Sequence, residues 1–574
     1  MYRAPVEEMV FTLRHVACAG DEALDPDLLN AVLEEAARFA SNEMAPLAES
    51  GDRQGLKLQS GTVTMPDGWK ELYAHWREGG WAGVMAPDQW GGQGLPVTVA
   101  MAVHEMWNSA SMSFGLCPML TSGAVEALAH HASPELQDRY LPKLISGEWT
   151  GTMNLTEPQA GSDVGALTTR AVDRGDGTYR IFGQKIFITF GEHDLTDNII
   201  HLVLARIEGA PAGTKGISLF LVPKILVNED GSLGSRNDLV CAGIEHKLGI
   251  HASPTCTMVY GDKGEGAVGW LVGEANRGLN AMFTMMNNAR LAVGIQGVAL
   301  AEAATQKALA YAGERRQGRS ARHEGSGMAP ILHHPDIQRT LLTMKALTAA
   351  SRAICYLCAQ ALAEAEGTEN KPFWAERGAL LTPVAKAFST DIGVEVSSLG
   401  LGVHGGMGFI EETGAARFYR DARIAPIYEG TNGIQAIDLV ARKLPLGQGE
   451  HVHGFIADLR EVVEAVRTSN RPGFGATAEK LGAALDALTE ATRFLQSAEP
   501  DSALAGATPY LRLFGLATGG VLLAKGALAD EGESRTALCR FFAENLIGQA
   551  TALKDEVIGG AESLARAADL LLAS

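Results

Sequence analysis

The sequence predicts a mainly α-helical protein with a central antiparallel β domain. Three observations support this: the length of the chain, helical periodicity in its first and later parts, and short β-type runs between them. A chain of 574 residues exceeds what one hydrophobic core supports, so three or four domains are expected. The predicted domains are an α-helical one at 1–150, a β domain at 151–275, a four-helix bundle at 276–445 and a C-terminal helical domain at 446–574.

The first helical segment is predicted to begin at about residue 25. Asp25 is a suitable N-cap, Pro26 fits the first helical position, and apolar residues then recur at helical spacing. A second helix, in PDGWKELYAHWREGGW, is expected to stop at the pair Gly79-Gly80. These signals make the first domain helical.

The β domain is indicated by short runs rich in branched and aromatic residues, bounded by glycine, asparagine, aspartate and proline. The clearest runs are YRIFGQKIFIT, IIHLVLARI, GISLFLVP and CTMVYG. The turn RGDGTYR lies between two strands and predicts a hairpin. Because no helical segments alternate with these strands, we expect an antiparallel sheet and not a doubly wound one.

Long helical segments return after residue 276. Three long helical segments can be recognised within 276–445, and such a succession is typical of a four-helix bundle. The last domain is rich in alanine and leucine and carries more acidic than basic residues. Cys355 and Cys358 form a lone C-x-x-C inside a helix, with no second pair at zinc-like spacing, so we interpret them as packing residues. No metal site is expected.

Composition and charge exclude several classes of function. The net charge of −19 disfavours binding to nucleic acid or to an anionic membrane surface. We expect no apolar run to be long enough to cross a bilayer. Glu7 and Glu8 interrupt the start of the chain, which argues against an export signal. Seven cysteines in so long a chain fit a reducing compartment, and we expect a cytoplasmic protein.

The first chemically informative motif is MNLTEPQAGSD at 153–163. It leaves the helical region, turns around Pro158 and Gly161, and enters the sheet. Its backbone amides, together with the hydroxyls of Thr156 and Ser162, suit a flat polar heteroaromatic ring with several hydrogen-bonding atoms.

The second motif is KIFITFGE at 185–192. Side chains alternate along a strand, so Phe187 and Thr189 are predicted to share one face. A ring edge and a hydroxyl on that face suit packing against the same flat group.

The third motif, RDARIAPIYEGTNGIQ at 420–435, contains a candidate base. Glu429 follows an apolar run in a Tyr-Glu-Gly turn, where Gly430 permits a tight backbone and Thr431 can cap the next helix. Apolar surroundings disfavour the ionised carboxylate, so the pKa of Glu429 should rise toward the range useful for proton abstraction. Glu411 and Glu412 are the nearest alternative carboxylates, and we expect them on a solvated helix start.

MNLTEPQAGSD, KIFITFGE, ERRQGR, LGVHGGMGF and YEGTNGIQ occur in this order, and together they resemble the acyl-CoA dehydrogenase family over roughly residues 25–445. The resemblance implies an α N-terminal domain, a β-barrel-like middle domain and a four-helix bundle, here with an appended C-terminal helical domain. That extra domain and the start MYRAPVEEMVFTLRHV are similar to a larger subgroup. The subgroup includes the 3-methylthiopropanoyl-CoA dehydrogenases of dimethylsulfoniopropionate breakdown and some bacterial fatty-acyl-CoA dehydrogenases.

The resemblance implies non-covalent FAD and an acyl-CoA substrate. The implied FAD contacts are Met153, Leu155, Thr156, Ser162, Phe187, Thr189, Arg315, Gly402, Gly405, Gly406 and Thr431. The implied substrate contacts are Ser162, Arg290, Tyr428, Glu429 and Gly430. Arg315 is expected to reach the FAD pyrophosphate across a subunit boundary. The chain departs from the usual family pattern at Gly318, Gly402 and Gly433.

The implied reaction is α,β-dehydrogenation of the acyl thioester to a trans-2-enoyl-CoA, with Glu429 taking the α-proton and FAD accepting the β-hydride. The leading specific substrate is 3-methylthiopropanoyl-CoA, with short- or medium-chain fatty acyl-CoA as the alternative. Electron-transfer flavoprotein is the expected acceptor, and a homodimer is expected, with a tetramer possible. An acyl-CoA oxidase stays open. A DNA-associated flavoprotein of the same fold is disfavoured because such relatives have a basic C-terminal domain.

Overall fold

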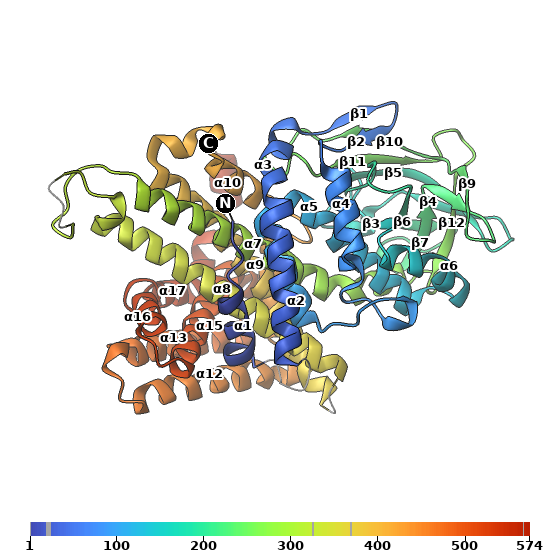
Figure 1. Cartoon of the computed structure of the whole chain (residues 1–574). Coiled ribbons are helices and arrows are strands. Elements are labelled where there is room, and N and C mark those ends of the chain that lie inside the picture. Colours follow the sequence, from blue (N-terminus) through green and yellow to red (C-terminus); the bar gives the residue numbers. More distant parts are fainter. Residues whose placement is uncertain (1, 19–24, 324–326, 368–369, 566, 574) are drawn as a thin grey trace. The chain divides into compact units, whose positions relative to one another are not determined.

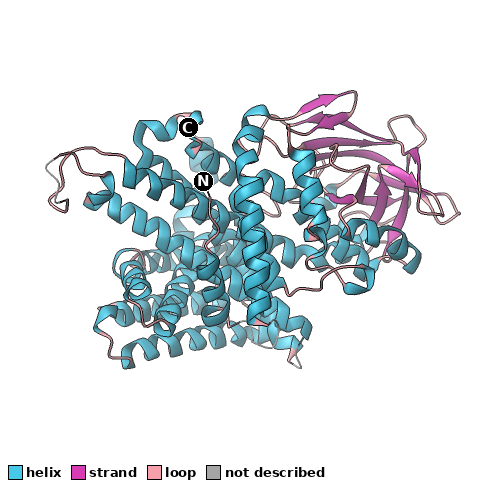
Figure 2. Cartoon of the chain, viewed as in Figure 1, coloured by secondary structure: helices cyan, strands magenta, loops and turns pink. Residues whose placement is uncertain are grey.

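The computed structural model describes residues 2–18, 25–323, 327–367, 370–565 and 567–573. The chain forms two compact units. The helical unit comprises Met1–Ala37, Val97–Ser109 and Arg290–Ser574, and the barrel unit comprises Arg38–Pro96 and Ala110–Ala289. Every strand of the described residues lies in the barrel unit (Figure 2). The prediction of a mainly α protein with a central β domain is therefore confirmed.

The barrel unit holds short strands in three sheets. They are β1 (Lys57–Gln59), β2 (Thr62–Thr64), β3 (Trp149–Asn154), β4 (Arg170–Asp173), β5 (Tyr179–Thr189), β6 (Asn198–Ile207), β7 (Ile217–Pro223), β8 (Ile225–Val227), β9 (Leu233–Arg236), β10 (Leu239–Ile244), β11 (Thr255–Tyr260) and β12 (Ala267–Val272). The main sheet has the order β10-β11-β5-β12-β7-β6-β3, and β4 pairs with both β5 and β6. The pairings therefore close a ring through β5, β12, β7, β6 and β4, which makes the sheet barrel-like.

Most strand pairs are antiparallel, as predicted, but β6 pairs in parallel with both β3 and β4. The predicted hairpin is present, with β4 and β5 paired around the turn at 174–178. The β1–β2 hairpin in the first segment was not predicted. Its strands have three residues each, too few for a period-two pattern to stand out.

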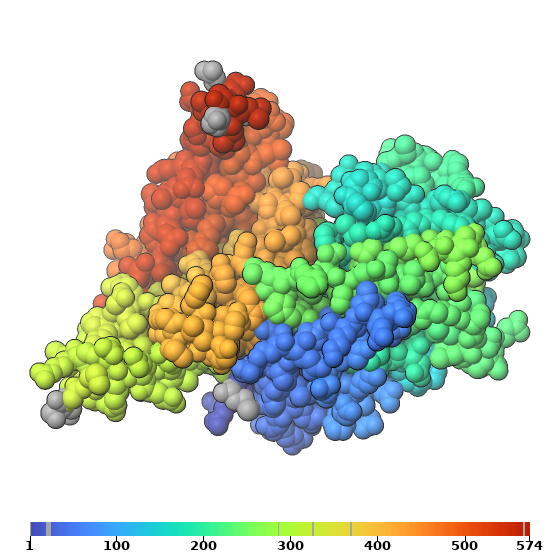
Figure 3. Space-filling model, turned by 90° about the horizontal axis from the view of Figure 1, so that it is seen from above, coloured from blue at the N-terminus to red at the C-terminus, as the bar shows by residue number. Residues whose placement is uncertain are grey.

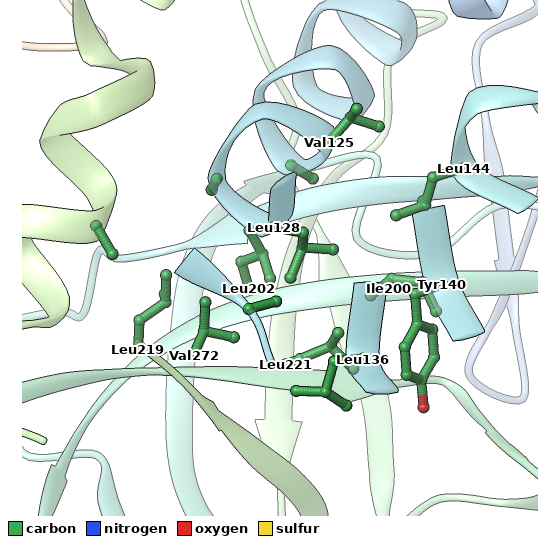
Figure 4. Packing of buried hydrophobic residues seen from close by; sticks show 14 of the residues in the cluster. Val125, Leu128, Leu136, Tyr140, Leu144, Ile200, Leu202, Leu219, Leu221 and Val272 are labelled. Carbon is green, nitrogen blue, oxygen red and sulfur yellow. The ribbon is translucent and has the colours of Figure 1, made fainter. Parts of the chain in front are cut away.

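The core of the barrel unit lies on both faces of β6 and β7, because every residue of β7 and most of β6 is buried. On one face Leu202 and Leu221 pack in a cluster with side chains of two helices. These helices are α5 (Val97–His131) and α6 (Pro134–Ile145). Figure 4 shows Val125 and Leu128 of α5 above these strands, with Leu136 of α6 beside them. The opposite face is buried in a second cluster within the barrel.

The longer helices form the rest of the structure (Figure 1). They are α2 (Pro26–Phe39), α3 (Ala45–Gln54), α4 (Trp69–Glu78), α5 (Val97–His131), α6 (Pro134–Ile145), α7 (Gly278–Glu314), α8 (Pro335–Gly367), α9 (Lys371–His404), α12 (Glu450–Thr468), α13 (Thr477–Ser497), α15 (Ala507–Ala529), α16 (Glu533–Asn545) and α17 (Gln549–Leu564). The shorter ones are α1 (Val6–Phe11), α10 (Ala415–Ala422), α11 (Asn432–Asp438), α14 (Pro500–Ala505) and α18 (Ala567–Leu572).

The predicted helix ends are confirmed where the signals were strong. The Asp25 carboxylate accepts hydrogen bonds from the backbone N–H groups of Asp27 at 2.8 Å and Leu28 at 3.2 Å, so it caps α2. Helix α4 ends at Glu78, and Gly79 of the predicted pair is its C-cap. Helix α5 is interrupted at Ser111, whose φ of −155° and ψ of 97° are not helical.

The C-terminal helices pack directly on the bundle helices of the helical unit. A Cβ built on Gly515 of α15 would lie 2.3 Å from the ring of Phe388 on α9. Only a glycine permits this approach. Residues 290–574 accordingly belong to one compact unit, and the division at 445/446 stays a prediction.

Within the described part of the chain, three helices, α5, α8 and α15, are long and apolar enough to cross a membrane by length and composition alone. The expectation that no run is long enough is therefore wrong. In each helix, 78% of the apolar window is buried inside the protein. Packing between helices uses this apolar surface. Cys355 and Cys358 on α8 are likewise fully buried, in agreement with their interpretation as packing residues.

Candidate active site

The sequence-predicted site residues divide between the two units. The barrel unit holds Met153, Leu155, Thr156, Ser162, Phe187 and Thr189. The helical unit holds Arg290, Arg315, Gly402, Gly405, Gly406, Tyr428, Glu429, Gly430 and Thr431. Within each unit the structure brings together residues that are distant in sequence.

In the barrel unit, the motif that follows β3 lies beside the end of β5. The Lys185 ammonium donates to the carbonyl oxygen of Leu155 at 3.0 Å and to the carboxylate of Glu157 at 2.8 Å. The N–H of Ile186 donates to the carbonyl oxygen of Thr156 at 2.9 Å. Two motifs about 30 residues apart are thus fixed side by side, as a shared ligand surface requires.

Glu157 and Lys185 form a buried ion pair, with side chains 2% and 0% exposed. Burial alone would raise the pKa of Glu157, but Lys185 and hydrogen bonds from Thr169 and Thr168 outweigh it and lower the pKa to about 2. Burial lowers the pKa of Lys185 to about 8, and Glu157 offsets part of that shift. Sequence reasoning missed this pair. The available signal was a lysine at an inward-facing position of a strand.

Phe187 lies on a β-bulge. Ile186 and Phe187 together lie opposite the single residue Thr257 of β11, and Phe187 has a φ of 60°. Its ring is 58% exposed, although large aromatic side chains are usually buried. Thr189 is half-buried, whereas Ile188 between them is buried, which agrees with the predicted shared face. Bulges that re-aim a side chain are common beside functional sites.

The barrel-unit residues fit the ring of FAD. Four of the implied contacts are half-buried, namely Met153, Leu155, Thr156 and Thr189. Ser162 is exposed. Asn154, which lies between Met153 and Leu155 at the end of β3, is buried and lies on the opposite face of the strand from Met153. Apolar side chains, hydroxyls and an exposed aromatic ring along two adjoining segments form a suitable surface for a flat heteroaromatic group with polar edges.

In the helical unit, Glu429 lies in a tight turn before α11. Glu429 has a φ of 53° and Gly430 a φ of 84°. Positive φ at a residue other than glycine costs about 1–3 kcal/mol and is typical of functional sites. Thr431 caps α11 as predicted, since its hydroxyl accepts from the N–H of Ile434 at 3.2 Å. The side-chain amide of Gln435 donates to the carbonyl oxygen of Glu429 at 3.3 Å.

Glu429 is half-buried. Burial raises its pKa, and Arg290 and Lys386 offset part of that rise, so the direction agrees with the sequence-based expectation. Arg290, on α7, forms an ion pair with Asp438 at 3.3 Å. Among the described residues the Nε of Arg290 is buried without a hydrogen-bond partner. The turn thus combines a carboxyl whose pKa is raised with a nearby guanidinium.

Two further side chains anchor this turn. The Tyr428 hydroxyl donates to the side-chain oxygen of Gln296 on α7, and burial raises the pKa of Tyr428. Lys386 on α9 donates from Nζ to the carbonyl oxygen of Gly430 at 2.8 Å. Lys386 was missed from sequence. The available signal was one lysine within the apolar stretch PVAKAF of a helix.

The remaining predicted residues lie at the surface of the helical unit. Arg315, Gly402, Gly405 and Gly406 are all exposed. Of the three glycines, only Gly405 has a positive φ, at 59°, where α9 ends. Glu411, an alternative base, is 57% exposed at its side chain and pairs with Arg420 at 2.8 Å. This solvated ion pair offers none of the desolvation found at Glu429.

Comparison with known proteins covers almost the whole chain. Four sequence models match: the acyl-CoA dehydrogenase N-terminal domain at 27–148, the middle domain at 152–262, the C-terminal domain at 276–444, and an acetyl-CoA dehydrogenase C-terminal-like domain at 452–568. The chain belongs to the acyl-CoA dehydrogenase family. It is therefore a FAD-dependent oxidoreductase that dehydrogenates acyl-CoA. The predicted helical, β-barrel and helical domains with an extra C-terminal helical domain are confirmed.

Individual relatives of this acyl-CoA dehydrogenase differ in their substrates. The chain is 44% identical to a 3-methylmercaptopropionyl-CoA dehydrogenase of Ruegeria pomeroyi over 98% of this chain and 99% of the relative. It is 35% identical to a butyryl-CoA dehydrogenase of Syntrophomonas wolfei over 81% of this chain and 78% of the relative. A Caenorhabditis elegans structure in complex with C11-CoA has a TM-score of 0.77 at 22% identity, covering 97% of this chain and 95% of that one. It shows the fold.

Proposed function

We propose that this acyl-CoA dehydrogenase uses Glu429 to remove the α-proton of a short or medium acyl-CoA, with 3-methylthiopropanoyl-CoA as the leading substrate. The observation that supports the base is the turn itself. Glu429 is the carboxyl held at positive φ, and burial raises its pKa. The observation that supports the substrate is full-length similarity to the Ruegeria pomeroyi enzyme, whose named substrate is the same thioester under an older name.

The chemistry of the proposed step follows from the weak acidity of the α-hydrogen. A base is most effective when its pKa lies near the working pH, and burial moves Glu429 in that direction. The backbone N–H of Glu429 is proposed to donate to the thioester oxygen, where negative charge develops as the proton leaves. Arg290 and Lys386 stabilise the carboxylate form that must be present before the step.

The residues proposed to hold FAD are those implied by the family motifs. In the barrel unit Phe187 and Thr189 would cover one face of the flavin ring, while Leu155, Thr156 and neighbouring groups would hold its polar edge. When bound, FAD supplies the acceptor for the hydride that leaves the β-carbon. We propose electron-transfer flavoprotein as the physiological acceptor, and the oxidase alternative predicts rapid peroxide formation in air instead.

We also propose that the enzyme is a homodimer. Arg315 is exposed just after the end of α7, where the ring of Tyr311 stacks on His404 at the end of α9 with centroids 4.5 Å apart. The segment that follows α9 exposes Met407, Phe409 and Ile410 by 50%, 88% and 44%. The amber part of the chain in Figure 3, to which this segment belongs, reaches the molecular surface. An exposed apolar patch, together with an arginine proposed to bind the pyrophosphate of FAD, suits a second copy of the chain. The net charge of −19 disfavours binding to nucleic acid or to an anionic membrane, and the seven cysteines in so long a chain support a cytoplasmic enzyme.

The test of the base is Glu429→Gln, with Glu411→Gln as a matched control. The amide keeps the volume and the turn but cannot accept the proton. We expect anaerobic flavin reduction to slow by about 10²–10⁴-fold or more, while FAD content and the acyl-CoA-induced spectral shift persist. Glu411→Gln should behave as wild type. Flavin reduction by Glu429→Gln at the wild-type rate would show that the base is another group.

The substrate is tested with a panel of thioesters and a dye acceptor. Butanoyl-, octanoyl-, palmitoyl- and 3-methylthiopropanoyl-CoA are compared by kcat/KM. The highest value is expected for 3-methylthiopropanoyl-CoA. A clear preference for palmitoyl-CoA would overturn the substrate proposal and leave the proposed base intact.

A further inference from the structure

A buried lysine connects α9 to the catalytic turn. Lys386 is 0% exposed, and its ammonium donates to the carbonyl oxygen of Gly430 and to the side-chain oxygen of Asn432, both at 2.8 Å. Helix α7 closes over this part of α9, since a Cβ built on Gly294 would lie 2.5 Å from the carbonyl oxygen of Ala385. A long cationic side chain is therefore enclosed where an apolar one would pack at less cost.

The amide of Asn432 extends the connection. Its oxygen accepts from Lys386, while its nitrogen donates to the carboxylate of Asp391 at 2.8 Å and to the carbonyl oxygen of Ala387 at 3.1 Å. Both ends of the amide are engaged, so its orientation is fixed. One turn of α9 thereby binds the first residue of α11 and the peptide group between Gly430 and Thr431.

These bonds act on the residues that surround the base. The carbonyl held by Lys386 belongs to Gly430, the residue after Glu429, in a turn where both have positive φ. Loss of that bond frees the strained turn to relax toward ordinary backbone angles. The Lys386 charge also favours the carboxylate form of Glu429.

We infer that Lys386 is a positioning residue of the reaction: it holds the turn that presents Glu429 and supplies a positive charge that keeps this carboxyl ionised. The inference rests on the proposed role of Glu429 as the base. It goes beyond that role, because it assigns the geometry and the charge state of the base to a lysine on another helix.

The charged groups around Lys386 come from three elements. Asp391 is on α9, Glu429 is in the turn, and Arg290 extends from α7. Burial lowers the pKa of Lys386 to about 7, because the stabilisation from Asp391 and Glu429 is smaller than the cost of desolvation, and Arg290 adds to the lowering. The lysine is thus cationic below about neutral pH. It keeps N–H donors for both hydrogen bonds when it is neutral.

The test uses the FAD-loaded enzyme and three variants: Lys386→Met, Lys386→Arg and the control Lys371→Met. Lys371 is exposed at the start of the same helix. Anaerobic flavin reduction is measured across pH by stopped flow, and acyl-CoA affinity by titration calorimetry. For Lys386→Met we expect a rate constant lower by about 10²-fold, as for a small misplacement of reacting groups. The affinity for acyl-CoA should change by less than about threefold, which is close to the uncertainty of comparing two variants.

The pH profile separates positioning from simple loss of structure. Without the lysine charge, the pKa of Glu429 rises, so the acid limb of the rate profile should move to higher pH in Lys386→Met. Lys386→Arg keeps a charge, so its acid limb should stay near that of wild type even if its rate is lower. Lys371→Met should match wild type throughout. Asn432→Ala removes one acceptor of Lys386 and should lower the rate by a smaller factor, which provides a second variant if Lys386→Met does not fold.

Two results would overturn the inference. One is a Lys386→Met enzyme with wild-type rate and acid limb. The other is a parallel loss of rate, affinity and thermal stability in both Lys386 variants and in Asn432→Ala, with the acid limb unmoved, which would make the network purely structural. Failure of the proposed function looks different, since wild-type flavin would then not be reduced by acyl-CoA or Glu429→Gln would match wild type.

Discussion

The buried pair of Glu157 and Lys185 gives the sharpest stability prediction. In Lys185→Met, Glu157 loses its cationic partner but still accepts four hydrogen bonds, from Gln159, from the N–H and hydroxyl of Thr168, and from the N–H of Thr169. Removing one partner of a buried ion pair lowers the free energy of unfolding by about 3–5 kcal/mol. Because these four donors still satisfy Glu157, we expect the loss for Lys185→Met to be at the lower end, about 3 kcal/mol.

Glu157→Gln should be the more damaging change. The Lys185 ammonium would stay buried, and the carbonyl oxygen of Leu155 would be its main neighbour within hydrogen-bonding distance. We expect a loss of about 5 kcal/mol, the upper end for an uncompensated buried charge. The double variant should lose about 1–3 kcal/mol less than the sum of the single losses, because neither charge is then left alone.

Tryptophan fluorescence during urea unfolding measures this effect. Six of the eight tryptophans, Trp69, Trp76, Trp81, Trp90, Trp149 and Trp270, lie in the barrel unit, so the signal reports mainly on that unit. Lys215→Met, at an exposed lysine of the same unit, is the matched control and should leave the midpoint unchanged. The reasoning fails if Lys185→Met is the more destabilising single variant, or if the single losses add within about 0.5 kcal/mol.

Three further predictions follow from the same structure. Folding lowers the pKa of Glu157 to about 2, so its stabilisation is complete above the unfolded pKa of about 4.3 and is lost as pH falls toward about 2, which acid titration of the fluorescence midpoint checks. Phe187→Ala should raise the Kd of FAD by about 3–10-fold, as loss of an aromatic contact does. It should leave the melting temperature of the apoprotein unchanged, because the side chain is largely exposed. An unaltered FAD affinity would contradict the assignment of Phe187 to the cofactor site. Phe409→Glu should shift the mass measured by light scattering toward the monomer, and an unchanged dimer would remove this patch from the interface.

The sequence predicted those parts of the fold that depend on neighbouring residues, such as helix ends and hairpins. Asp25 sits at a helix N-terminus because its short carboxylate satisfies free backbone N–H groups, a preference that holds in any context. Strand β5 was predicted from its alternation and its hairpin turn. By contrast, pairing of β6 in parallel with β3 joins strands that are separated by a long stretch of chain, and no local pattern specifies such a contact.

The candidate site shows the same division. Glu429 was predicted because its Tyr-Glu-Gly turn follows an apolar run and stands at the catalytic position of the five family motifs that occur in order. Its positive φ was not predicted, since that angle depends on bonds from Gln435 and Lys386 on either side of the turn. The bulge at Phe187 was missed for a similar reason: it depends on the register with β11. Charges that pair only in the folded state, such as Glu157 and Lys185, are invisible to periodicity.

The glycine contact between α15 and α9 links the last quarter of the chain to the helix that carries Lys386, the proposed positioning residue. Phe388, which touches Gly515, is two residues from Lys386. Arg512 on α15 pairs with Glu395 at 2.9 Å and helps to stabilise the charge of Asp391. Random mutagenesis of the C-terminal helices should therefore yield slow enzymes as well as unstable ones. A screen that scored only solubility would miss such variants, and kinetic defects mapped to Gly515 would indicate that packing of the appended helices affects the proposed proton transfer.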